Sequence, residues 1–96
     1  MRITIHGDER QVVLKVEGRV ADPVIGEFRR AWQELAGSLG TRKLSVDLCG
    51  VTFMTANGRN LLAEIHAKTG AEFVADTPMT KYFAEEAMHH VQGISK

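Results

Sequence analysis

Apolar and polar residues alternate one by one near the start of the chain. The alternation covers residues 2–6 and returns over residues 12–17, after the turn-forming pair Gly7-Asp8. A period of two with β-branched residues is typical of strands that bury one face. We therefore expect two strands that form an antiparallel hairpin. Their inward positions are Ile3, Ile5, Val12, Leu14 and Val16.

The period lengthens to three and four residues over residues 25–39, which predicts an amphipathic helix. Asp22 followed by Pro23 is typical of an N-cap and a first helical residue, and Gly40 is suited to end the helix. The large side chain of Trp32 is expected in the core. The inward positions are Ile25, Phe28, Trp32, Leu35 and Leu39.

The second half of the chain again passes from a period of two to a spacing of three and four residues. Residues 44–49 alternate like a third strand, and residues 50–54 are expected to form a turn. Residues 58–69 then have the spacing of a second helix, which Gly70 ends. The inward positions of this helix are Leu61, Leu62 and Ile65.

A short fourth strand and a third helix complete the pattern. The strand is expected at residues 72–76. The pair Thr77-Pro78 is again a capping residue followed by a proline, so the helix is expected to begin there. Its expected apolar face contains Met79, Tyr82, Phe83 and Ala87.

The order is strand-strand-helix-strand-helix-strand-helix, and it predicts the class of the fold. Strand-helix-strand units imply parallel pairing with right-handed crossovers. Strands covered on both faces are apolar throughout, whereas each strand here has one polar face. We therefore expect one α/β domain over residues 1–96: two layers, with about four strands in a mixed sheet and the helices mainly on one face.

Composition and charge narrow the possible roles. Hydrophobic residues make up 44% and charged residues 25%, as in ordinary globular domains. Twelve basic and twelve acidic residues give no net charge, so no field favours nucleic acid or an anionic membrane. The chain shows no apolar signal core and no apolar run of membrane-spanning length. With the single cysteine Cys49, this indicates a cytoplasmic protein without membrane insertion.

Motifs that assemble a reaction are missing from the sequence. It has no Gly-rich phosphate loop, no Gly-x-Ser-x-Gly elbow, no His-Glu-x-x-His and no paired cysteine site. Cys49 has no histidine beside it in a recognisable motif, so we interpret it as structural. We expect a protein that is not an enzyme and that needs no metal or cofactor.

The segment 44–58, Leu-Ser-Val-Asp-Leu-Cys-Gly-Val-Thr-Phe-Met-Thr-Ala-Asn-Gly, resembles the core signature of STAS domains, the family of anti-sigma-factor antagonists. The family pattern is an apolar strand ending in Asp-Leu-Ser, then Gly-Val and an apolar pair, then Asp-Ser-Ser-Gly opening a helix. The resemblance extends over roughly residues 10–90. It implies a STAS-like fold and a regulatory module that binds another protein.

In the family, a kinase phosphorylates the second serine of Asp-Ser-Ser-Gly, and the added charge drives the partner off. This chain carries Asn57 at that position, Thr55 in place of the aspartate and Ala56 in place of the first serine. Because Asn57 cannot be phosphorylated, the usual serine switch is expected to be missing. The hydroxyl of Thr55 is the possible substitute acceptor.

The resemblance also implies where a partner docks, namely the loop and helix over residues 47–62. The partner is expected to be an anti-sigma kinase or the ATPase of a phospholipid-transport ABC system, and the protein a monomer or weak dimer. An alternative is a small carrier of apolar ligands, which needs a cavity of hundreds of Å³. The expected docking residues are Asp47, Thr52, Thr55, Ala56, Asn57, Gly58, Arg59 and Leu62.

Three of these residues also have expected structural roles. Asn57 is a good N-cap for the helix that starts at Gly58. Asp47, at the expected end of its strand, is placed to accept backbone hydrogen bonds from the 50–55 turn. Arg59 in the first helical turn opposes the helix dipole. We expect it to be solvated, with two alternatives: contact with an acidic partner, or an anion held together with the free N–H groups of the helix start.

Overall fold

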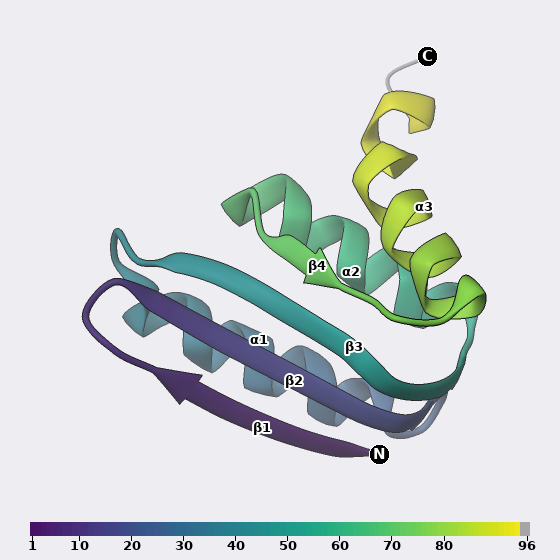
Figure 1. Ribbon diagram of the computed structural model, residues 1–96, viewed down its shortest axis with the longest axis horizontal. Helices are drawn as coiled ribbons and strands as arrows, with labels where there is room; N and C mark the ends of the chain where they lie inside the picture. The colour runs from purple at the N-terminus through teal and green to yellow at the C-terminus, as the bar shows by residue number, and fades with distance from the viewer. Residues whose placement is uncertain (95–96) are drawn as a thin grey trace.

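The computed structural model describes residues 1–94, with the side chains of residues 1–89. All seven expected elements are present, in the expected order (Figure 1). They are β1 (Arg2–Gly7), β2 (Gln11–Val20), α1 (Ile25–Leu39), β3 (Lys43–Met54), α2 (Ala56–Thr69), β4 (Glu72–Val74) and α3 (Pro78–Ile94).

The four strands form one mixed sheet in the order β1-β2-β3-β4. The first pair is antiparallel, and the pairs β2–β3 and β3–β4 are parallel. Because the sheet grows in one direction, both crossover helices lie on the same side of it. Figure 1 shows α1 behind the strands and α2 behind β4. The expected two-layer α/β fold is confirmed.

The core lies between the sheet and the helices, where the alternation of β2 and β3 buries one face completely. The other face, turned away from the helices and called the open face below, carries half-buried polar side chains such as Lys15 and Asp47. The five apolar positions of α1 are buried as expected, and Trp32 is 2% exposed. Other core residues include Val12, Leu14, Val16, Val46, Leu48, Leu61 and Ile65.

The start of α1 differs from the prediction. The helix begins at Ile25 after Val24, and no side chain caps it, so the expected cap by Asp22 is wrong. Asp22 lies three residues before the first helical residue, and its Oδ2 accepts a hydrogen bond from Asn57 instead. The expected C-terminal residue Gly40 is confirmed, with a positive φ of 62°.

The expected turn at residues 50–54 is also wrong, because β3 continues to Met54. This segment pairs with the second half of β2, but the register shifts twice on the way. Those shifts disturb the alternation from which a strand is recognised. Gly50 looked like a turn residue, but its role is steric: a Cβ there would lie 2.6 Å from Cγ of Glu17.

The third helix begins as expected, with the N–H of Thr80 donating to Oγ1 of Thr77 at 3.0 Å. Its buried stripe differs from the prediction, because Met79 and Tyr82 are exposed. The stripe follows the helical spacing and contains Thr80, Phe83, Ala84 and Ala87. Among residues 1–94, no helix is both long and apolar enough to cross a membrane.

Candidate functional site at the start of α2

The first turn of α2 is capped by Thr55. Its backbone is extended, as an N-cap requires, and its Oγ1 accepts a hydrogen bond from the N–H of Gly58 at 3.4 Å. The N–H of Arg59 also donates to the carbonyl of Thr55, at 3.0 Å. The helix therefore starts two residues earlier than expected, and the prediction that Asn57 is the N-cap is wrong.

Asn57 lies inside the first turn and is exposed. Its Nδ2 donates a hydrogen bond to Oδ2 of Asp22 at 3.2 Å. These residues are far apart in sequence, so the bond connects the start of α2 to the segment before α1. Asn57 thus has a structural partner in a different part of the chain.

Arg59 contacts α3. Its Nε forms an ion pair with Oε1 of Glu86 at 2.6 Å, and its guanidinium lies 5.7 Å from the ring centre of Phe83. The hydroxyl of Tyr82 donates to the same carboxylate at 3.1 Å. The expectation of a solvated arginine is therefore wrong. A carboxylate from α3 offsets the unfavourable position of this cation at the positive end of a helix.

Two of the expected docking residues are buried. Leu62 is 0% exposed and belongs to the core. Gly58 is also buried, and a Cβ there would lie 2.7 Å from Cγ of Met54 and 3.1 Å from Cγ1 of Val20. Leu62 and Gly58 therefore hold the start of α2 against the sheet, and they offer a partner no surface.

Asp47 lies in the middle of β3, at a distance from the start of α2. At the usual rise per residue, it is roughly 20 Å before Met54 along the strand. Its Oδ1 accepts a hydrogen bond from the N–H of Cys49 at 2.9 Å, so the predicted bonds from residues 50–55 are not its partners. The extension of β3 explains the difference, because Asp47 does not stand at the end of a strand.

Asp47 and Cys49 influence the ionisation of each other. Partial burial favours the neutral carboxyl of Asp47, but hydrogen bonds from the N–H and thiol of Cys49, together with the charge of Lys15, hold its pKa below the usual value. The hydrogen bond to Asp47, burial and the carboxylate charge raise the pKa of Cys49 to about 11. The thiol is therefore protonated at neutral pH, which makes it a poor nucleophile.

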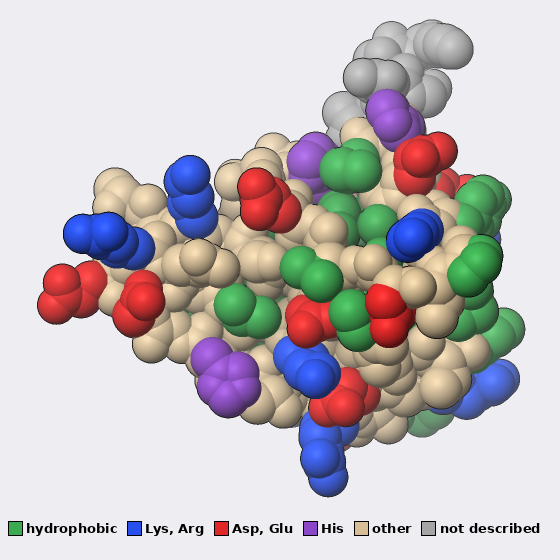
Figure 2. All heavy atoms as spheres, in the orientation of Figure 1, with side chains coloured by type: hydrophobic (Ala, Val, Ile, Leu, Met, Phe, Trp, Pro, Cys, Tyr) green, Lys and Arg blue, Asp and Glu red, His purple; other side chains and the backbone are tan. Residues whose placement is uncertain are grey.

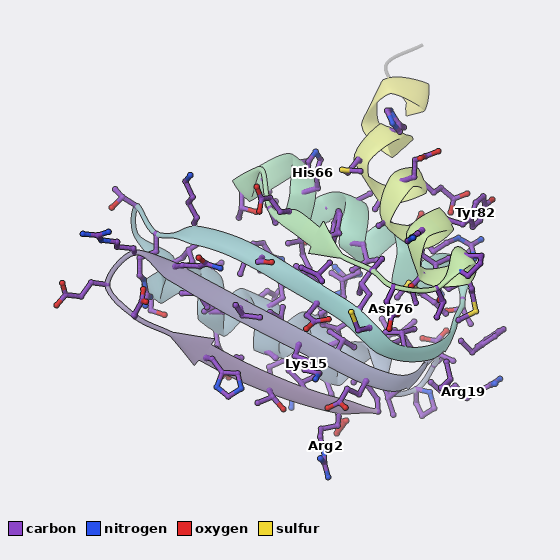
Figure 3. All side chains as sticks on the ribbon, in the orientation of Figure 1. Arg2, Lys15, Arg19, His66, Asp76 and Tyr82 are labelled. Carbon is purple, nitrogen blue, oxygen red and sulfur yellow. The ribbon has the colours of Figure 1, made fainter. Side chains whose placement is uncertain are left out.

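Sequence reasoning missed one aromatic contact beside this site. Phe53 is 40% exposed, and the guanidinium carbon of Arg19 lies 4.3 Å from its ring centre. The two residues are paired across β2 and β3, and Figure 3 shows Arg19 at the end of β2. The sequence contained a signal for this exposure. Phe53 and Met54 are successive apolar residues, and successive side chains of a strand point to opposite faces, so only one of the two can face the core.

This end of the sheet therefore carries exposed residues from four segments, namely β2, the segment before α1, β3 and the start of α2. We call them the β3–α2 surface, defined by Arg19, Asp22, Thr52, Phe53, Ala56 and Asn57. The surface combines a half-exposed aromatic ring, a cation, a carboxylate and an amide. Such a mixture is typical of protein contact surfaces, in which aromatic residues and arginine are enriched.

A depression of about 430 Å³ lies elsewhere, near the beginning of β2, β3 and β4. Polar side chains such as Lys43 and Glu72 dominate its walls, so it is poorly suited to an apolar ligand. Its lining residues are Gln11, Lys43, Leu44, Ser45, Thr69, Gly70 and Glu72.

Comparisons with known proteins show the fold. No model of a known protein family matches the chain, and no curated protein matches its sequence. Among solved structures, it resembles an anti-sigma factor antagonist from Mycobacterium paratuberculosis, with a TM-score of 0.73 and 21% identity over 97% of this chain and 78% of that one. It also resembles a protein named Mglu, with a TM-score of 0.61 and 20% identity over 78% of this chain but 19% of that one. The chain therefore has a STAS-like fold.

Proposed function

We propose that this chain is a non-catalytic regulatory module of the anti-sigma-factor-antagonist type, which docks a partner protein through the β3–α2 surface. The observation that carries the proposal is the exposed Phe53, with the guanidinium of Arg19 over its ring. It lies at the strand–helix junction where the STAS resemblance places the partner. Aromatic residues and arginine are both enriched at protein–protein interfaces, and arginine is among the residues that contribute most to affinity.

The chemistry of the described side chains supports a binding role. The one thiol, Cys49, is held protonated by Asp47 and is poorly suited to attack a substrate. Acidic and basic side chains alternate over the open face in Figure 2, so this face offers no field of one sign for a polyanion. The polar lining of the depression at Lys43 and Glu72 disfavours the alternative of an apolar-ligand carrier.

We further propose that binding is not controlled by the usual serine phosphorylation. Asn57 has no hydroxyl, and its amide is engaged with Asp22. The substitute acceptor Thr55 is half-buried, and its oxygen accepts the N–H of Gly58. A kinase would have to open the first turn of α2 before it reached this hydroxyl.

The experiment begins with a pull-down that uses the purified chain as bait, followed by mass spectrometry. An anti-sigma kinase or a transporter ATPase is the expected partner, and its identity decides between these two classes. Titration of that partner then compares Phe53→Ala with the control Val74→Ala, which removes a similarly exposed apolar side chain from β4. We expect Phe53→Ala to weaken binding by roughly tenfold or more and Val74→Ala to leave it unchanged.

Equal affinities for Phe53→Ala and the parent would show that the partner docks elsewhere. The switch is tested separately, by incubating the chain with the kinase and ATP and analysing its peptides by mass spectrometry. We expect no phosphate on the peptide that contains Thr55 and Asn57. Phosphate on Thr55 would contradict this part of the proposal and leave the docking surface standing.

A further inference from the structure

The outer edge of β1 is an unpaired strand edge. β1 is the first strand of the sheet, and within residues 1–94 it pairs with β2 alone. The pairing is continuous from Arg2 to Gly7, without a bulge, so β1 keeps a regular register along its length. A strand in this position presents a row of free backbone donors and acceptors. In Figure 1 this edge lies on the side of the sheet opposite α3.

The two edges of the sheet differ in how they are protected. Proteins block an open edge with short strands, proline, lysine or bulges. The other edge strand, β4, has three residues. β1 has six residues and contains no proline and no lysine. It is therefore the edge that remains suited to pairing with another strand.

Ile5 adds an apolar contact to this edge. It is opposite Leu14 in the register, so its side chain points to the helix-covered face, but it is 46% exposed. The strand thus offers unpaired backbone and an uncovered apolar side chain at the same place.

We propose that β1 of a second copy of this chain pairs antiparallel with β1, around a two-fold axis perpendicular to the sheet at Thr4. Residues directly opposite each other in an antiparallel pair point to the same face, and such an axis keeps the helix layers of both copies on one side. In this register Thr4 faces Thr4 of the second copy. Ile3 faces Ile5, and Arg2 faces His6.

The sequence of β1 is self-complementary in this register. Every residue from 2 to 6 is paired, and each Ile5 gains an apolar cross-strand neighbour, Ile3 of the second copy. Arg2 faces His6 in this register, so the two copies of Arg2 do not lie opposite each other. The result is a continuous eight-stranded sheet. Because edge pairing of one short strand is small compared with standard interfaces, the dimer is weak and concentration-dependent.

The dimer is tested by sedimentation equilibrium over a wide concentration range, with any affinity tag at the C-terminus. The parent is expected to show a monomer–dimer equilibrium. Ile5→Lys places a charge at the edge and should leave a monomer at every concentration. Val74→Lys is the control, because Val74 is 44% exposed on the opposite edge strand, and it should dimerise like the parent. Thermal melts verify that both variants fold.

The register is tested by disulfide formation in a Cys49→Ser background. Directly opposite residues have Cα atoms about 4.5–5.5 Å apart, within the range of a disulfide. Thr4→Cys should therefore give a covalent dimer under mild oxidation. Arg2→Cys should not, because the two copies of that residue lie about 13 Å apart along the strands.

Two results would overturn the proposal. One is a parent that stays monomeric up to the highest concentration at which it is soluble. The other is a dimer that Ile5→Lys leaves intact, or that Thr4→Cys does not crosslink. Combining Arg2→Cys with His6→Cys should restore crosslinking, and failure of that pair would exclude the register centred on Thr4.

Discussion

Asn57→Asp tests the contact that joins the start of α2 to the segment before α1. The substitution replaces the donor Nδ2 by an oxygen and changes the shape of the side chain little. The hydrogen bond to Asp22, 3.2 Å long in the parent, is replaced by repulsion between two carboxylates. The new charge also lies in the first turn of a helix, where the dipole favours an anion.

The free energies of these opposing effects predict a net loss of stability. Loss of the hydrogen bond costs about 0.5–1.5 kcal/mol, and two carboxylates about 4 Å apart in water repel by about 1 kcal/mol. The favourable interaction of the new carboxylate with the helix dipole offsets about 0.3–1 kcal/mol of this loss. The net free energy of unfolding should therefore fall by about 1 kcal/mol. For a domain of this size, that lowers the melting temperature by about 4–8 °C.

Thermal melts of four proteins separate the contributions: the parent, Asn57→Asp, Asp22→Asn, and the double variant that exchanges the two side chains. The exchange restores one amide and one carboxylate, so the double variant should melt near the parent. Added salt should reduce the loss in Asn57→Asp, since these groups are exposed. Asn57→Asp melting at or above the parent, with no coupling in the double variant, would refute the reasoning.

Three further results are expected. Trp32→Ala should lower the free energy of unfolding in urea melts by about 3–5 kcal/mol, because the indole is buried, and a loss below about 1 kcal/mol would contradict its core position. Thr55→Ala should cost about 1 kcal/mol in the same assay, whereas Thr55→Ser, which keeps a hydroxyl for Gly58, should be nearly neutral. Cys49 should react slowly with iodoacetamide at about pH 8.5, because Asp47 raises the pKa of the thiol to about 11, and Asp47→Asn should speed the reaction.

The same pKa has a consequence for stability at alkaline pH. A cysteine thiol in the unfolded chain has its ordinary pKa of 9.0 and loses its proton first, while Cys49 in the folded chain keeps its proton up to about pH 11. The unfolded state then binds fewer protons, so the free energy of unfolding falls as the pH rises from about 9 to 11.

The periodic signals carried the prediction of the fold because they depend on burial alone. The spacing of the apolar residues in α1 and the alternation in β2 each specify which face meets the core, and the structure buries those faces. The extension of β3 to Met54 was not predicted because two register shifts interrupt the alternation there. Gly50 resembled a turn residue because the carboxylate side chain that excludes a Cβ, Glu17, comes from another strand.

Partners distant in sequence explain the errors at the site. Asp22 and Asn57 are both good caps by residue type, but the helices start at other residues. α1 begins at Ile25, and the extended residue before α2 is Thr55, which therefore caps that helix, while Asp22 and Asn57 bond to each other. Arg59 likewise looked solvated because its carboxylate partner, Glu86, lies on α3. Local preferences cannot specify contacts of this kind.

These contacts give the first turn of α2 three independent anchors. The N–H of Thr55 donates to the carbonyl of Val20 at the end of β2, Asn57 joins the turn to Asp22 before α1, and Arg59 joins it to Glu86 on α3. A surface held from three directions loses little conformational entropy when a partner docks. A charge introduced at Asn57 or Thr55 would disturb the anchor made by that residue, so modification there should affect stability and binding together. That coupling is the reason to measure melts and affinities on the same set of variants.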